Sequence, residues 1–361
     1  MLARAYWPIA PRPTDRRKER DTCMGASYAA AMFAVIVMTS FTHAYAQEVA
    51  QPASTGDKVP VSIIFDTDIG SDCDDAGALA LLHALADRGE VDLVGTIYSS
   101  GRNRYGAGVC DAINRWYGRG NLPVGQYAGN DVGDARDSYN SQIAKDTVRF
   151  PHKIVDNAPE MIAVYRQMLR SRPDGSVTIL TVGHPHGLVL LMRDTEGMQL
   201  IRSKVRRWVA MGGSCDHPEP DWNFTQNGMG SYLAELLANW PTEAIFSPDG
   251  ADVTTGNRLL PATPENNPVR EAYRLWDNCL KKGRSSWDQI AALAAVRPKY
   301  FEFQRPGASE RTADGKSSWN PKADNPKHSR ARVKIDKKKL ADIIEELMAA
   351  PPQAKAGAGR R

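Results

Sequence analysis

The chain has 361 residues, of which 42% are hydrophobic and 24% charged, a composition typical of a soluble globular protein with room for one large domain or two ordinary ones. Its formal charge is +4, and the first 46 residues carry most of it, with six basic and three acidic side chains. The rest of the chain is nearly neutral, so charge gives no reason to expect a nucleic acid as partner.

The first 46 residues have the pattern of a signal peptide. A basic stretch, RRKER, precedes a short apolar stretch, ASYAAAMFAVIVMTSF, and the residues AYA stand just before Gln47. The apolar stretch is short for a bilayer span. We therefore expect residues 1–46 to be removed after Ala46, and the mature chain to be exported, periplasmic or secreted, without a stable membrane anchor. An uncleaved signal anchor is the alternative.

Export would place the cysteines in an oxidising compartment. Four cysteines follow the predicted cleavage point: Cys73, Cys110, Cys215 and Cys279. One or two disulfides fit this number, and the spacing does not assign the pairs. The sequence has no C-x-x-C, so a thiolate zinc site is not expected.

Residues 47–58 are polar and small and are predicted to be a linker, and residues 59–350 alternate strand-like and helical patterns. Strands are predicted at 61–65, 91–98, 122–127, 176–183, 204–213 and 243–248. Helices are predicted at 76–86, 106–117, 160–171, 188–193, 230–240, 269–282, 287–296 and 336–348. Long loops are predicted at 128–157 and 257–268, loop or weakly paired strands at 305–330, and a disordered tail at 351–361. The alternation predicts a single α/β domain with a mostly parallel, Rossmann-like open sheet flanked by helices. Its site should lie at the carboxyl ends of the strands.

Five aspartates stand between the first predicted strand and the first predicted helix, in the stretch FDTDIGSDCDDAGAL. They are Asp66, Asp68, Asp72, Asp74 and Asp75. A hard divalent cation takes several carboxylate and carbonyl oxygens, and its charge would relieve the repulsion among these side chains. An acidic surface loop is the alternative, with Asp74 and Asp75 favoured in the first turn of a helix. That alternative leaves Asp66 and Asp68 unexplained.

The same stretch resembles the N-terminal signature of the nucleoside hydrolase family, which is roughly D-x-D-x-G-x-D-D-A. This chain has two more residues between the Gly and the D-D pair, as in a divergent member. Four further stretches resemble elements of that family in the same order: GRNR, TILTVGHPHGL, GGSCDHPEPDWNF and SSWDQIAALAAVRP. Together the five stretches span roughly residues 61–300.

The resemblance implies a Ca²⁺-dependent N-glycoside hydrolase that releases a base and ribose through attack of a water. It implies Asp68 as the catalytic base. The implied metal ligands are Asp68, Asp75, the carbonyl of Val182 and Asp288. The implied contacts to the ribose are Asp74, Asn103, Asp221 and Asn223. Asp66 would support the loop, and Asp72 falls in the two-residue excess and receives no role.

The group that protonates the leaving base is open at this point. Trp287 stands where the family has a histidine, and its indole could stack on a base. His184, His186 and His217 fall in loops near the inferred site, and His217 is preferred because it follows the Gly-Gly strand end. The expected partner is a nucleoside or a related ribosyl compound, and the resemblance implies a homodimer or homotetramer.

Two other functions fit the same residues. Trp287 and the Asp-for-Glu change at Asp221 suggest an exported binding protein that holds the sugar without turnover. The strand followed by D-x-D also fits another carboxylate-metal hydrolase, such as a phosphatase.

Overall fold

The computed structural model describes residues 59–213, 221–311, 317–323 and 327–353. The predicted signal peptide and linker, the predicted tail beyond residue 353, and His217 lie outside the described residues. In the part of the chain that is described, no helix is both long enough and apolar enough to span a membrane.

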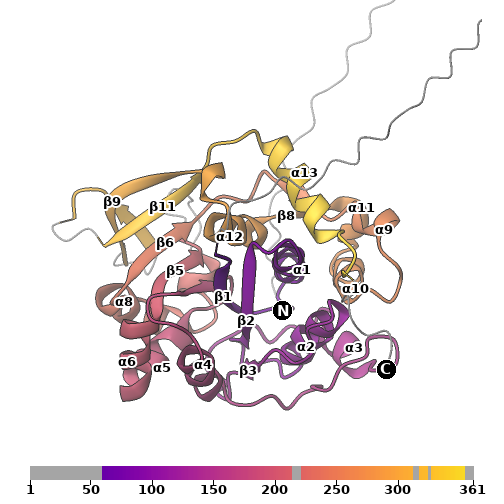
Figure 1. Cartoon of the computed structure of the whole chain (residues 1–361), viewed down its shortest axis with the longest axis horizontal. Coiled ribbons are helices and arrows are strands. Elements are labelled where there is room, and N and C mark those ends of the chain that lie inside the picture. The colour runs from indigo at the N-terminus through magenta and orange to yellow at the C-terminus, as the bar shows by residue number, and fades with distance from the viewer. Residues whose placement is uncertain (1–58, 214–220, 312–316, 324–326, 354–361) are drawn as a thin grey trace, which may run out of the picture. The chain divides into compact units, whose positions relative to one another are not determined.

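A nine-stranded sheet carries the domain, in the order β10-β9-β11-β6-β5-β4-β1-β2-β3 (Figure 1). Its strands are β1 (Val61–Thr67), β2 (Val91–Tyr98), β3 (Val124–Gln126), β4 (Val177–Thr181), β5 (Val205–Met211), β6 (Glu243–Ser247), β9 (Phe301–Arg311), β10 (Ser317–Asn320) and β11 (His328–Val333). The seven strands from β11 to β3 pair in parallel, and β9 and β10 continue the sheet antiparallel. Strand β1 lies between β2 and β4, so the strand order reverses at its carboxyl end. This is the place where open α/β sheets bind ligands.

Helices cover both faces of this sheet (Figure 1). They are α1 (Asp74–Asp87), α2 (Gly106–Trp116), α3 (Asn140–Lys145), α4 (Met161–Arg170), α5 (His186–Arg193), α6 (Thr195–Lys204), α7 (Trp222–Thr225), α8 (Gly230–Asn239), α9 (Leu259–Ala262), α10 (Pro268–Leu275), α11 (Cys279–Lys282), α12 (Trp287–Val296) and α13 (Lys337–Met348). Residues of α1, α2, α10, α12 and α13 share one hydrophobic cluster, and residues of α4, α5, α6 and α8 share the other. The fold is therefore the predicted one, a mostly parallel sheet between two helical layers.

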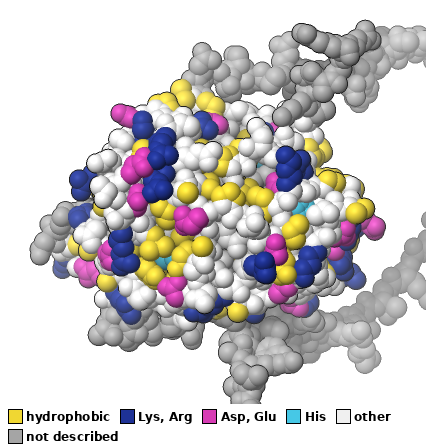
Figure 2. Space-filling model, turned by 90° about the horizontal axis from the view of Figure 1, so that it is seen from below, with side chains coloured by type: hydrophobic (Ala, Val, Ile, Leu, Met, Phe, Trp, Pro, Cys, Tyr) yellow, Lys and Arg dark blue, Asp and Glu magenta, His cyan; other side chains and the backbone are white. Residues whose placement is uncertain are grey.

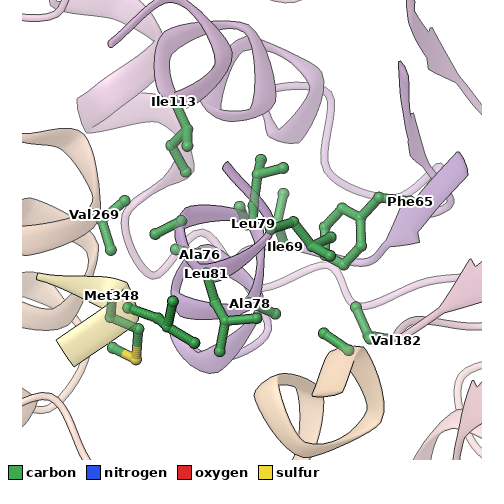
Figure 3. Close-up of a cluster of buried hydrophobic side chains, with 14 of the residues drawn as sticks. Phe65, Ile69, Ala76, Ala78, Leu79, Leu81, Ile113, Val182, Val269 and Met348 are labelled. Carbon is green, nitrogen blue, oxygen red and sulfur yellow. The ribbon is translucent and has the colours of Figure 1, made fainter. Parts of the chain in front are cut away.

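Helix α1 lies at the centre of the first cluster. Figure 3 shows its side chains, among them Leu79, with Phe65 of β1, Ile113 of α2 and Met348 of α13 around them. The helix is apolar on nearly every side and all but its last two residues are buried, as expected for a helix enclosed by other elements. Because the first turn of the helix is buried too, water does not stabilise the charges of Asp74 and Asp75.

The structure differs from the predicted elements in several places. The helix predicted at 269–282 is divided into α10 and α11, because Asp277 and Asn278 have positive φ angles of 47° and 53°. The loops predicted at 128–157 and 257–268 contain the short helices α3 and α9, and α6 was not predicted. Much of 305–330 is paired strand, and a separate two-stranded ribbon joins β7 (Thr254–Thr255) to β8 (Arg284–Ser285).

On the face in Figure 2, basic and acidic side chains are interspersed.

Candidate functional site

The carboxyl ends of β1, β2 and β4 meet closely. The amide of Val182 donates to the carbonyl of Asp66 at 2.8 Å, and the amide of Ser99 donates to the carbonyl of Thr67 at 2.9 Å. Gly183 allows this approach, because a Cβ there would lie 2.4 Å from the backbone nitrogen of Asp68. The loop that follows β1 is thus fixed against the loop that follows β4.

Three carboxylates converge beside this junction. Asp72, Asp74 and Asp288 each offer an oxygen within 4.8 Å of the others. The backbone amide of Asp288, in the first turn of α12, also faces Asp74 Oδ2 at 3.4 Å. The N-termini of α1 and α12 therefore meet. Of the predicted metal ligands, Asp288 belongs to this group of described residues, whereas Asp68 and Asp75 do not.

Arg284 connects two of these carboxylates, and no pattern in the sequence predicted this role. Its Nη2 donates to Asp72 Oδ2 at 2.6 Å and its Nε donates to Asp74 Oδ1 at 3.0 Å. The guanidinium also lies over the ring of Trp276, 4.8 Å from the centroid. Asp72, which had no predicted role, is therefore the ion-pair partner of Arg284.

Burial raises the pKa of Asp74, Asp75 and Asp288 well above the ordinary range, and the neighbouring carboxylates raise each of them further. Asp72 is the exception. Burial acts against its charged form too, but the positive charge of Arg284 prevails and lowers its pKa. One guanidinium thus faces several buried acids.

These residues fit a divalent cation. The Oδ1 atom of Asp288 is buried and has no hydrogen-bond partner among the described residues. Buried carboxylates that repel one another, together with an unpaired carboxylate oxygen, form a donor set that a hard cation satisfies with oxygen ligands. The charge of such an ion would lower the raised pKa values.

Asp68 and Asp75, the other predicted metal ligands, lie at the same strand end and are 3% and 1% exposed. The hydroxyl of Thr67 donates to Asp75 Oδ1, and the hydroxyl of Ser71 donates to Asp68 Oδ2 at 3.2 Å. The Nδ1 atom of buried His184 lies 3.1 Å from that same Asp68 oxygen. His184, one of three histidines considered from the sequence, is therefore the one that faces the predicted base.

Asp66 was predicted to support the loop. It is fully buried, and the hydroxyl of Tyr165 donates to its Oδ2 at 2.5 Å. Burial raises the pKa of Asp66 to about 7, although the hydrogen bond from Tyr165 lowers it.

The predicted ribose contacts divide into two groups. Asn223 donates from Nδ2 to the carbonyl of Val182 at 2.6 Å, so two predicted site residues meet. Asp221 caps α7 by accepting from the amide of Phe224 at 3.0 Å.

Asn103 and Trp287 are placed differently. Asn103 donates to the carbonyl of Arg136 at 2.9 Å and accepts from the amide of Tyr105 at 2.9 Å. Trp287 begins α12, is partly exposed, and packs on Gly250, where a Cβ would lie 2.6 Å from its ring. The Asn103 amide is therefore bonded to two backbone groups, and Trp287 precedes Asp288 in the first turn of α12.

Fold and site together define an open, parallel α/β domain with a buried acidic site at its topological switch point. No protein-family model matches the chain, and no curated protein matches it in sequence. Solved structures do match, and they show that the chain has the nucleoside hydrolase fold. The plant nucleoside hydrolase PpNRh1 superposes with a TM-score of 0.61 at 17% identity, over 81% of this chain and 100% of that one.

Two further solved structures match the same fold. The inosine–uridine-preferring nucleoside hydrolase from Bacillus anthracis gives a TM-score of 0.60 at 15% identity, over 80% of this chain and 99% of that one. The type III effector protein XopQ, complexed with adenosine diphosphate ribose, gives a TM-score of 0.60 at 12% identity, over 82% of this chain and 96% of that one. At these identities the likeness establishes the fold, as the sequence resemblance predicted.

Proposed function

We propose that this chain is a Ca²⁺-dependent N-glycoside hydrolase acting on a nucleoside or a related ribosyl compound. The observation that carries the proposal is the group of buried, mutually repelling carboxylates at the switch point of a nucleoside hydrolase fold. A transition state with positive charge on the sugar is stabilised by such an acidic pocket.

Asp68, Asp75, the Val182 carbonyl and Asp288 would hold the ion. When bound, Ca²⁺ would supply the positive charge that acidifies the attacking water and anchors ribose hydroxyls. Asp74 is left for the ribose, because Arg284 neutralises it from the other side.

Asp68 takes the proton of the water in this scheme. The Ser71 hydroxyl donates to its Oδ2 atom, and the Nδ1 atom of His184 lies 3.1 Å from the same oxygen. Direct attack by water would invert the anomeric carbon. Asn223 keeps the Val182 carbonyl in place from the far side of the site.

Two neighbours of the site bear on the leaving base. The indole of Trp287 is too weak an acid to protonate the leaving base, but it is partly exposed and could stack on a base. His184 is buried beside Trp222, with ring centroids 6.5 Å apart. His217 remains the preferred acid from the sequence.

The test measures reducing sugar released from inosine, uridine, adenosine and p-nitrophenyl riboside, with Ca²⁺ and with chelator. We expect release that chelator abolishes and that Asp68→Asn lowers by about 10²–10⁴-fold. Asp174→Asn is the matched control, because Asp174 is exposed and pairs only with Lys204 among the described residues. Tight ribose binding without turnover would instead indicate the binding protein. Cleavage of p-nitrophenyl phosphate alone would contradict the proposal and indicate a phosphatase.

We also propose that residues 1–46 are removed on export and that the mature enzyme is a dimer or tetramer. N-terminal sequencing of the mature chain, expected to begin at Gln47, and its mass in solution test these two points.

A further inference from the structure

Two segments far apart in the sequence run side by side at the candidate site. Residues 71–74 run from the loop before α1 into its first residue, and residues 276–288 run from the end of α10 to the start of α12. Trp276 Nε1 donates to the carbonyl of Ser71 at 3.0 Å. Arg284 binds the carboxylates of Asp72 and Asp74. These contacts begin and end the shared stretch and hold the segments in a fixed register.

A pair of thiols lies between those contacts. The side chains of Cys73 and Cys279 lie close enough for each thiol to shift the pKa of the other. Cys73 is 0% and Cys279 2% exposed, so neither thiol faces solvent. The left-handed residues Asp277 and Asn278 produce the turn that starts α11 at Cys279. The backbone on both sides is thus set before any bond forms between the sulfurs.

We propose that Cys73 and Cys279 form a disulfide in an oxidising compartment, and that this bond locks the acidic loop to the segment that carries Arg284 and Asp288. The inference is independent of the hydrolase activity. With oxidised glutathione as the oxidant, its S–S bond breaks and the Cys73–Cys279 bond forms. Two molecules of reduced glutathione take up the two protons and two electrons that the protein thiols lose. A mixed disulfide between one cysteine and glutathione is the intermediate.

The tested protein keeps only the cysteines that the structure describes. Cys110 is the third described free cysteine, and it is buried in α2. Cys23 and Cys215 lie outside the described residues and are replaced by serine in the tested protein. This background leaves three cysteines, of which Cys73 and Cys279 shift each other's pKa.

The experiment refolds the reduced, unfolded protein in a buffer of reduced and oxidised glutathione, so that the oxidant can reach the thiols, and then blocks the remaining thiols with N-ethylmaleimide in denaturant. A tryptic digest is then examined by mass spectrometry without reduction. We expect residues 59–88 and 275–281 to appear as one cross-linked species, with Cys110 alkylated. Recovery of both peptides as separate alkylated species would overturn the proposal, and so would a cross-link from either peptide to Cys110.

Stability gives a second readout. The bond closes a loop of about 200 residues, so oxidation should raise the Tm by roughly 5 °C or more. The rise should vanish in Cys279→Ser and in Cys73→Ala, and it should persist in Cys110→Ser. Each variant is compared with its own reduced form, so a variant that is simply less stable still gives an answer. A rise that persists without Cys279 would contradict the pairing.

Discussion

Replacing Arg284 with glutamine tests whether the guanidinium is the internal counter-charge of the acidic site. The change removes the hydrogen bonds to Asp72 and Asp74 and leaves those carboxylates uncompensated. Breaking a buried ion pair costs about 3–5 kcal/mol. The side chains of Arg284 and Asp72 are 25% and 22% exposed, which favours the lower end, about 3 kcal/mol.

For a domain of this size about 3 kcal/mol corresponds to a fall in Tm of roughly 6 °C. Thermal unfolding would be followed by circular dichroism for wild type and Arg284→Gln, each with chelator and with Ca²⁺. We expect the full fall only with chelator, because a bound divalent cation supplies the charge that Arg284 no longer provides. The variant should therefore gain more from Ca²⁺ than wild type does.

Arg88→Gln is the matched control, because Arg88 pairs with Glu346 at 2.8 Å while the two side chains are 37% and 56% exposed. Loss of such a surface pair costs at most about 1 kcal/mol. If Arg284→Gln in chelator melts within about 1 °C of this control, the charge compensation inferred here is wrong. Equal gains from Ca²⁺ in wild type and variant would refute the link to the metal site.

Two other substitutions test separate parts of the fold. Gly183→Ala should lower stability by about 1–3 kcal/mol and weaken Ca²⁺ binding in calorimetry, because its Cβ would press on the Asp68 backbone. Gly230→Ala, where the nearest atom is the Thr225 carbonyl oxygen at 3.1 Å, should cost less stability and leave Ca²⁺ binding unchanged. Burial lowers the pKa of His83 to about 3, from an ordinary value near 6.5. The unfolded chain then binds more protons than the folded one, so the free energy of unfolding falls as the pH drops through 6.5. Urea unfolding at pH 7.5 and pH 5 should show a smaller loss in His83→Gln than in wild type, and an equal loss would argue against a neutral buried His83.

The acidic loop could be predicted from the sequence because its signal is local. A buried strand followed by Asp66 and Asp68 and by the first turn of a helix places the carboxylates at a strand end, whatever the rest of the chain does. The resemblance then extended the prediction to Asp288, which the structure brings to the loop. His184 was named but not preferred, because no local pattern shows that its ring faces Asp68.

Arg284 could not be predicted in the same way. It stands 210 residues from Asp74 in the sequence and belongs to a two-residue strand with no amphipathic pattern. Only the three-dimensional path of the chain between α10 and α12 brings it to the acids. The break at Asp277 and Asn278 did have a local signal, since these residue types tolerate the left-handed conformation, but the helical spacing of the apolar residues concealed it.

The two extra residues of the loop and the Arg284 segment are best understood as one unit. Compared with the family signature, the excess introduces Asp72 and Cys73, and each finds its partner in the segment that includes α11 and β8. Adding a carboxylate to carboxylates that already repel one another would raise the electrostatic free energy of the group. The positive charge of Arg284 cancels the added negative charge, so the net charge of the group is unchanged. The added loop also gains a fixed contact to the element that carries Asp288. A site that acquired Asp72 without Arg284 would therefore be less stable without metal and would depend more strongly on the ion for its folding.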